Sequence, residues 1–244
     1  MDKDHLTQVS NYLYSPIDWL DSVVPDELKI YPHPYRDYPF LLKNILFDYS
    51  TMHSFIDKHY QEIERIGIIE NNNGIFEAHN NKKIRNTYNL LPDDSFIQSY
   101  NRLFLHQKQS IEDFFKIALI QSTSPQILIY EEGCFYKRHS DNCSEIVDEN
   151  FQIIEFKPVA THRIITTVLF LSNSSEDIIN SNDFLGGELQ FDYLFDKDNN
   201  IYSLKPKEGD FIAFLSNPYF SHNVQKVIKG RRISIVQWHN CIIN

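Results

Sequence analysis

Two metal-ligating residue types lie two positions apart in the middle of the chain. On an extended strand, the side chains of His139 and Asp141 would point to the same face and could bind one ion. A further histidine, His222, begins a later predicted strand that can lie antiparallel to the first. Two imidazoles and one carboxylate would form a facial triad that leaves one side of Fe(II) open. A His-x-Asp tripeptide is also common by chance and is often only a satisfied polar pair.

The strand after His222 offers a cationic site for a carboxylate. Period-two alternation places Arg232 and Ser234 on one face of this strand and Arg231 on the other. A guanidinium can bind a carboxylate through two parallel hydrogen bonds, and a hydroxyl can add a third. We therefore expect Arg232 to bind a carboxylate, with an outward, salt-bridged arginine as the alternative. Tyr130, on the strand that leads to His139, either hydrogen-bonds to the same carboxylate or packs in the core.

The motifs around these residues resemble those of prolyl-4-hydroxylase-type 2-oxoglutarate/Fe(II) dioxygenases. The metal-binding strand of the family is similar to Tyr130-x-x-Gly133-x-x-Tyr136-x-x-His139-x-Asp141. The distal strand of its bacterial PKHD-type branch resembles His222-x-Val224-x-x-Val227-x-x-Gly230-x-Arg232, ending at Trp238. Three further motifs occur in the family's order: Arg163-x-x-Thr166, Gly186-Gly187-Glu188-Leu189 and Pro206-x-x-Gly209-Asp210. The resemblance spans roughly residues 39–242, and Lys226 and Ser172 depart from the residues that relatives prefer.

The resemblance implies a double-stranded β-helix, or jelly roll, that uses Fe(II), 2-oxoglutarate and O₂. It implies three iron ligands, His139, Asp141 and His222. It also implies that Arg232 pairs with the C5 carboxylate of 2-oxoglutarate with help from Tyr130, and that Thr166 lines the pocket. Succinate and CO₂ would be released, and ascorbate is expected as the reductant. Related halogenases carry a small residue in place of the acid, so Asp141 favours hydroxylation.

The remaining pattern predicts helices first and strands after. We expect a strand at Phe40–Phe47, a helix capped by Ser50 that includes Ile63, a hairpin at Asn73-Gly74, and a second helix from Ser95. The apolar stripe of this second helix comprises Ile111, Phe114, Phe115, Ala118 and Leu119. The expected strands are 126–131, 134–139, 151–157, 163–172, 187–193, 201–204, 210–215, 221–228 and 231–239.

This order of elements predicts an α+β chain in which N-terminal helices buttress the β-rich core. Residues 1–36 are expected to form an extension without a catalytic role, and residues 37–244 the oxygenase domain. The polar stretch 172–183 is predicted to be a loop that could close over a substrate.

The composition limits the classes of molecule that the protein is expected to bind. The net charge of −10 and the pI of about 5.4 disfavour nucleic acid and favour cationic or neutral peptides. Three cysteines without a Cys-x-x-Cys pair argue against a disulfide framework or a thiolate zinc site. No apolar run is long enough to cross a bilayer, and the N-terminus lacks a basic-then-apolar pattern, so we expect a cytoplasmic location. The oligomeric state stays open.

Our leading hypothesis is a hydroxylase of an amino-acid side chain in a peptide or protein, with proline as a candidate. The alternative is a hydroxylase of a free amino acid or another small metabolite. A jelly-roll binding module without catalysis is a hypothesis from a different class. A sugar-binding or isomerising cupin would also carry histidines in a barrel, but it would not need the pair Arg232 and Ser234.

Overall fold

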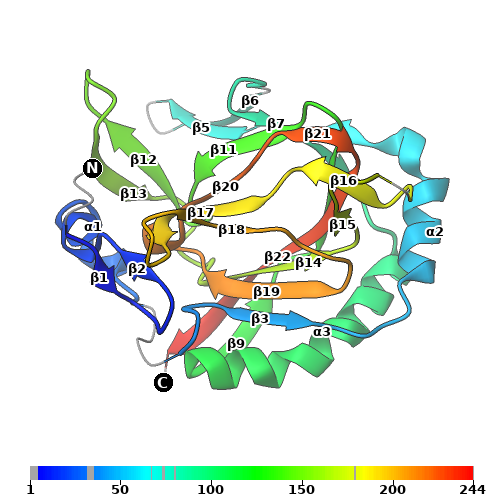
Figure 1. Cartoon of the computed structure of the whole chain (residues 1–244), viewed down its shortest axis with the longest axis horizontal. Helices are drawn as coiled ribbons and strands as arrows, with labels where there is room; N and C mark the ends of the chain where they lie inside the picture. Colours follow the sequence, from blue (N-terminus) through cyan, green and yellow to red (C-terminus); the bar gives the residue numbers. More distant parts are fainter. Residues whose placement is uncertain are drawn as a thin grey trace.

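Two antiparallel sheets form the body of the molecule (Figure 1). The computed structural model describes residues 5–31, 36–66, 68–72, 75–79, 81–178 and 180–243. The larger sheet has the order β3 (Leu41–Asn44), β19 (Asp210–Leu215), β14 (Ile165–Phe170), β22 (Arg232–Ile243), β10 (Gln126–Tyr130), β8 (Tyr88–Leu90) and β4 (Glu64–Arg65), with β9 (Ile117–Ser122) beside β22. The smaller sheet has the order β1 (Thr7–Gln8), β2 (Tyr14–Ser15), β17 (Leu189–Phe195), β20 (His222–Val224), β11 (Phe135–His139) and β7 (Arg85–Asn86), with β18 (Ile201–Leu204) beside β17.

Three small sheets and a few helices complete the fold. The small sheets are β12 (Cys143–Val147) with β13 (Ile153–Pro158), β5 (Ile68–Asn72) with β6 (Ile75–His79), and the set β15 (Asn173–Ser174), β16 (Asp183–Gly186) and β21 (Val227–Gly230). The α-helices are α1 (Ile17–Val23), α2 (Ser50–Lys58) and α3 (Asp94–Phe115). Short 3-10 helices are η1 (Asp26–Leu28), η2 (Tyr60–Glu62) and η3 (Pro218–Phe220).

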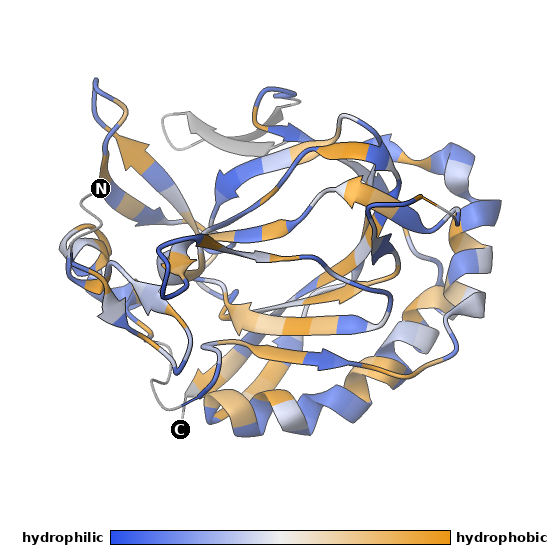
Figure 2. Ribbon diagram, in the orientation of Figure 1, coloured by the Kyte–Doolittle hydropathy of each residue, from blue (hydrophilic) through white to orange (hydrophobic). Residues whose placement is uncertain are grey.

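Strand β22 separates the interior of the barrel from the layer that contacts α3. Its register pairs Trp238 with Thr166 of β14 and Arg232 with Tyr130 of β10. Because side chains alternate along a strand, these residues share the inner face. His239 lies on the outer face, where its ring stacks on Phe104 of α3 at 4.7 Å. Figure 2 shows β19 largely in the colours of apolar residues, as expected for a strand covered on both faces.

The helices differ in their bounds from the sequence prediction. Helix α3 is capped by Asp93, whose carboxylate accepts a 2.8 Å hydrogen bond from the backbone N–H of Phe96, rather than opening at Ser95. The helix ends where Lys116 adopts the left-handed conformation, with φ of 57°. The apolar stripe therefore stops at Phe115, and the prediction that it continues through Ala118 and Leu119 is wrong, because those two residues belong to β9.

The expected helix near residue 50 also ends earlier. Helix α2 begins at Ser50, whose side chain makes no cap; Asp48 instead accepts a 3.0 Å hydrogen bond from the Ser50 backbone N–H. Ile63 lies beyond the helix, after η2. The predicted hairpin is present as β5 paired with β6, although its turn residues Asn73 and Gly74 lie outside the described residues.

Most of the described part of residues 172–183 is irregular, as predicted, but the stretch is held at both ends by strand pairing. Asn173 of β15 pairs with Asp183 of β16, and the Ser174 backbone N–H donates to Pro206 O at 2.7 Å. The side chain of Asn182 lies 3.4 Å from His53 of α2. Figure 1 shows this region beside α2, on the far side of the barrel from the hairpin β12–β13 that follows Asp141. A role of this stretch in closing over the substrate is therefore not supported.

The cysteines and the helices bear on two expectations, the absence of a disulfide framework and of a membrane span. All three cysteines, Cys134, Cys143 and Cys241, are free thiols. Within the described part of the chain, no helix has the length and apolarity needed to span a bilayer.

Candidate metal centre

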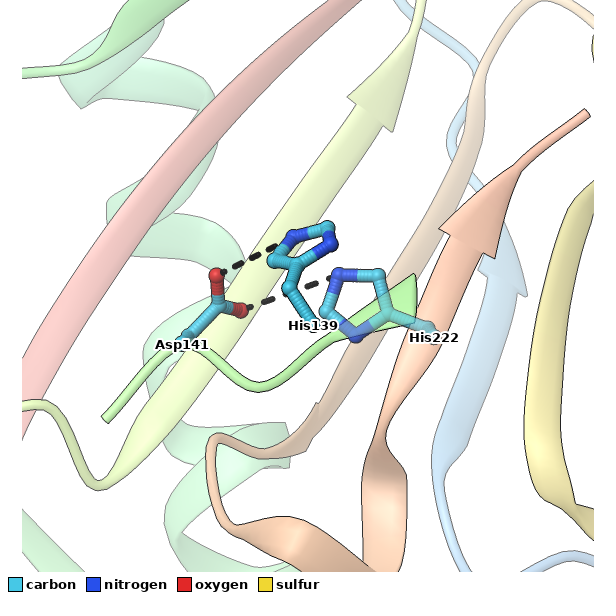
Figure 3. A group of neighbouring side chains, drawn as sticks. All are labelled: His139, Asp141 and His222. Carbon is cyan, nitrogen blue, oxygen red and sulfur yellow. Dashed lines mark ion pairs between the residues drawn. The ribbon is translucent and has the colours of Figure 1, made fainter. Parts of the chain in front are cut away.

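Three potential metal ligands converge inside the barrel (Figure 3). His139 is the last residue of β11 and His222 the first of β20, and the antiparallel register places them opposite each other. Asp141 lies in the turn after β11 and faces both rings. Its two carboxylate oxygens lie 3.8 Å from His139 Nε2 and 3.9 Å from His222 Nε2. The three ligand atoms all lie within 4.8 Å of one another, which is close enough for one ion.

Both histidines are oriented by main-chain carbonyls. His139 Nδ1 lies 2.9 Å from Lys137 O, and His222 Nδ1 lies 3.0 Å from Phe220 O. Because a carbonyl can only accept, each Nδ1 must carry the proton, which leaves the lone pair of Nε2 directed at the centre of the site. This is the tautomer that a metal ligand requires, so the donor set fits a divalent cation such as iron.

The carboxylate of Asp141 is held by a chain of two hydroxyls. Thr166 Oγ1 donates to Asp141 Oδ2 at 2.6 Å, and Ser216 Oγ lies 2.8 Å from the Thr166 hydroxyl. Since Thr166 uses its single proton on the carboxylate, Ser216 must be the donor to Thr166. Thr166 was predicted to line the cosubstrate pocket, and in the structure its hydroxyl donates to Asp141, one of the three potential ligands. The Arg163 guanidinium also donates to Asp141 O at 3.3 Å.

The charges of the site suit a neutral-imidazole, anionic-carboxylate ligand set. Burial and the neighbouring His222 lower the pKa of His139 to about 3. Burial raises the pKa of Asp141, but the two histidines and the Thr166 hydrogen bond outweigh it, so the net pKa is lowered. The ring of Tyr136 stacks on that of His139 at 3.6 Å, and the guanidinium of Arg85 lies 4.4 Å over the Tyr136 ring. The sequence motifs alone did not indicate a role for Tyr136 or Arg85.

Strand β22 carries a buried cation that has no acidic partner among the described residues. The side chain of Arg232 is 1% exposed, and its Nη1 donates to Ser234 Oγ at 3.0 Å. Its guanidinium lies over the rings of Tyr130, at 4.8 Å, and Phe170, at 5.0 Å. Within the described residues, Arg232 Nε has no hydrogen-bond partner and the guanidinium makes no ion pair. Burial lowers the pKa of Arg232 to about 10, so it is still charged at neutral pH.

The neighbouring Arg231 has a different environment. It forms an ion pair with Asp57 at 3.1 Å and lies 4.7 Å over the ring of Tyr60. It is thus the outward, paired arginine, whereas Arg232 points inward. Gly187 leaves room for Arg232, because a Cβ at this position would lie 3.1 Å from Arg232 Cδ and its φ of +67° disfavours other residues.

Two hydrogen-bond donors without a partner in the described part of the chain lie close to Asp141. The Arg163 guanidinium stacks 4.0 Å over the ring of Trp238. Among the described residues, neither Arg163 Nε nor Trp238 Nε1 has a hydrogen-bond partner, although both atoms are buried. Buried donors of this kind normally have partners, so they mark a place where another molecule can accept hydrogen bonds. Arg163 and Trp238 both belong to the sequence motifs, but the sequence did not indicate that their side chains stack on each other.

The comparison with known families decides the class of protein. Residues 125–240 match the family model described as the 2OG-Fe(II) oxygenase superfamily. This part of the chain is a 2-oxoglutarate/Fe(II)-dependent oxygenase domain. The match includes the three converging ligands and Arg232. No curated protein matches the chain at a significant level.

Solved prolyl hydroxylases share the fold of this oxygenase. A prolyl-4-hydroxylase from Pseudomonas putida is 17% identical, with a TM-score of 0.51, over 82% of this chain and 91% of that one. A Trichoplax adhaerens prolyl hydroxylase, solved with a hypoxia inducible factor peptide fragment, is 18% identical, with a TM-score of 0.53, over 82% and 83%. The viral collagen prolyl hydroxylase of Paramecium Bursaria Chlorella virus-1, in its 2OG complex, is 15% identical, with a TM-score of 0.51, over 82% and 94%. The resemblance to prolyl-4-hydroxylase-type dioxygenases is thus confirmed, and the jelly-roll core with it.

Proposed function

We propose that this oxygenase hydroxylates an amino-acid side chain in a peptide or protein, with proline as the first candidate. His139, Asp141 and His222 would hold the iron, and Arg232 would bind the C5 carboxylate of 2-oxoglutarate with Ser234 and Tyr130. When bound, iron and 2-oxoglutarate would supply the oxidising chemistry that places one oxygen atom of O₂ in a substrate C–H bond and releases succinate and CO₂. Ascorbate would serve as the reductant in turnover.

The observation that carries this proposal is the unpaired, buried guanidinium of Arg232. A buried charge without a partner is costly, so such a group is expected to receive a carboxylate from a ligand. Ser234 and Tyr130 lie against the same guanidinium and leave its Nε free. A barrel that only bound sugars, or one that had lost catalysis, would have no use for both this cation and an intact triad.

A peptide substrate is supported by the surface next to the metal centre. The buried, unpartnered N–H groups of Arg163 and Trp238 suit the backbone carbonyls of an extended chain. The hairpin β12–β13, which follows Asp141 directly, carries large apolar side chains in solvent, with Phe151 85% and Ile154 54% exposed. Exposed apolar groups beside a catalytic site favour a macromolecular partner. The neighbour from Trichoplax adhaerens was solved with a peptide fragment, which agrees with this choice.

One observation favours the alternative of a free amino acid. Arg85 lies over Tyr136, which stacks on His139, and its Nε has no partner among the described residues. Arg85 also makes no ion pair within that part of the chain. A cation so placed could bind the carboxylate of a free amino acid, so the choice between the two substrate classes needs an experiment.

Mass spectrometry can separate these candidates. The purified protein would be incubated with Fe(II), 2-oxoglutarate, ascorbate and air, together with basic or acidic proline-containing peptide libraries or with free amino acids. Peptides that gain one oxygen, with matching succinate, support the proposal, and a preference for basic libraries that fades with salt would reflect the net charge of −10. Modification of free amino acids alone would replace it with the alternative. Iron binding without succinate from any substrate would indicate a module that has lost catalysis. His222→Ala serves as the inactive control.

A further inference from the structure

Residues 216–221, between β19 and β20, contact the surroundings of all three proposed iron ligands; we refer to them as the bridging segment. Ser216 O accepts the backbone N–H of Asp141 at 3.1 Å, and the Ser216 hydroxyl supports Thr166 on the Asp141 carboxylate. Phe220 O accepts the Nδ1 proton of His222 at 3.0 Å. The geometry of the ligand set therefore depends on where this segment lies.

A further bond ties the bridging segment to the strand that carries His139. The hydroxyls of Ser221 and Ser140 lie 2.8 Å apart, and both residues are buried. Ser140 lies between His139 and Asp141, so the bond holds the chain at the point where β11 ends and the turn that carries Asp141 begins. Because β11 and β20 contribute one histidine each, a shift of the segment would change the distances between ligand atoms.

The bridging segment is held from outside by N-terminal residues. Asn217 Nδ2 donates to Ile30 O at 2.7 Å and to Leu28 O at 3.3 Å. The Tyr219 hydroxyl donates to the carboxylate of Asp21 in α1. Asn217 is 2% and Tyr219 1% exposed, so these polar groups depend on the N-terminal residues for their hydrogen bonds.

The carboxylate of Asp21 joins two parts of the N-terminal region at this point. Its second oxygen accepts the Tyr31 hydroxyl at 3.1 Å, and the Tyr31 ring packs against Tyr219 at 5.3 Å. The hydrogen bonds of Asn217 and Tyr219 to this region form only when the N-terminal residues pack against the bridging segment. All of these N-terminal residues lie outside the part of the chain, 125–240, that matches the oxygenase family model.

We propose that residues 17–31 brace the metal centre, with Asp21 and Tyr219 as positioning residues that set the affinity of the site for its metal. The inference rests on the proposed role of His139, Asp141 and His222 as ligands. Removing a group that orients a ligand directly typically lowers metal affinity 10–100-fold. The brace acts one step further out, through the bridging segment, so we expect its loss to raise the metal Kd about 3–10-fold.

The test measures metal binding rather than turnover. Mn(II) replaces Fe(II) because it resists oxidation, and its free concentration is followed by electron paramagnetic resonance with the full chain, well below its Tm. Tyr219→Phe and Asp21→Ala should each weaken Mn(II) binding 3–10-fold. The double variant should bind no more weakly than Asp21→Ala alone, because that substitution already removes the bond that Tyr219→Phe breaks. Asp21→Asn, which keeps an acceptor for the Tyr219 hydroxyl, should restore most of the affinity.

Tyr193→Phe is the matched control. Tyr193 is also a buried tyrosine, and its ring contacts Trp19 of α1, but its hydroxyl has no hydrogen-bond partner among the described residues. This variant should bind Mn(II) as the unaltered protein does. If Tyr219→Phe and Asp21→Ala lower Tm but keep Mn(II) Kd within twofold of the unaltered protein, the residues support folding only and the brace is refuted. If the unaltered protein binds no Mn(II), and no Fe(II) under anaerobic conditions, the proposed metal site itself is wrong, and the brace with it.

Discussion

The guanidinium of Arg232 lies 4.8 Å over the ring of Tyr130, and the two residues are directly paired across β22 and β10. The aromatic face shields the cation from water, and Ser234 takes up one of its N–H groups. This arrangement places a charged, partly unsatisfied guanidinium at a fixed depth in the barrel. Under the proposed function, this cation would bind one carboxylate of 2-oxoglutarate while the metal binds the other end of the molecule.

Replacing this cation should weaken cosubstrate binding. Arg232→Ala would leave a bound carboxylate buried without its partner, at a cost of about 3–5 kcal/mol. The apparent KM for 2-oxoglutarate should therefore rise by two or more orders of magnitude in a succinate assay. Arg231→Ala is the control, because it removes only a pair with the exposed Asp57 that is worth roughly 0.2–1 kcal/mol. Equal effects of the two substitutions would show that Arg232 does not bind the carboxylate.

Removing any proposed ligand should abolish turnover. Asp141→Ala leaves two imidazoles and no anionic ligand, so iron occupancy and succinate formation should both be lost. Iron content of the purified variant, measured by inductively coupled plasma mass spectrometry, is the direct readout. Full iron binding together with full succinate production in Asp141→Ala would contradict the triad.

Thr166→Val tests whether this residue serves the metal or the cosubstrate. The substitution keeps the shape of the side chain but removes the hydroxyl that donates to Asp141 at 2.6 Å. We expect about 10–100-fold weaker metal affinity with little change in the KM for 2-oxoglutarate, measured at saturating metal. Thr166→Ser should behave like the unaltered protein. A raised KM with unchanged metal affinity would instead support the role in lining the pocket that the sequence suggested.

The unpartnered donor of Trp238 should serve the primary substrate. Trp238→Phe keeps a ring beneath Arg163 but removes the buried Nε1 proton. Loss of one hydrogen bond costs about 0.5–1.5 kcal/mol, so the KM for a peptide substrate should rise roughly 2–12-fold. The rate of 2-oxoglutarate consumption without peptide should not change. An unchanged peptide KM would place the substrate elsewhere.

The buried His239 should make the protein less stable in mild acid. Its ring nitrogens are used by Ser122 and Thr167, and burial lowers the pKa of His239 to about 3 from an ordinary value of 6.5. The unfolded chain therefore binds a proton below pH 6.5 that the folded protein does not take up until about pH 3. The free energy of unfolding should fall in this window by about 1.4 kcal/mol per pH unit for this one group.

Denaturant titrations of the metal-free protein between pH 4 and 6 can isolate this contribution. His239→Gln keeps hydrogen-bonding capacity but has no titratable group. The unfolding of this variant should take up about one proton fewer, so its free energy of unfolding should change less steeply with pH. His139 is present in both proteins, and its effect cancels in the comparison. Equal slopes for the two proteins would show that His239 titrates normally in the folded state.

The sequence by itself determined the features that depend on local periodicity. Alternation along a strand is a property of neighbouring residues, and it was enough to place Arg232 and Ser234 on the face opposite Arg231. It also placed Asp141 near His139, although the structure has Asp141 in the turn after β11 rather than on the strand itself. The motifs identified the oxygenase family for the same reason, because each motif consists of residues close together in the sequence.

Only the tertiary structure decided which distant residues meet. Strand pairing brought His222 opposite His139, and it placed the Thr166 hydroxyl in hydrogen-bonding distance of the Asp141 carboxylate. The left-handed Lys116 ended α3 although the apolar stripe continued. The N-terminal residues, which carry no motif, contact the segment between β19 and β20 through Tyr219. Such contacts form because burial requires each polar group to find a partner, and that partner is set by the packing of the whole chain rather than by its neighbours in sequence.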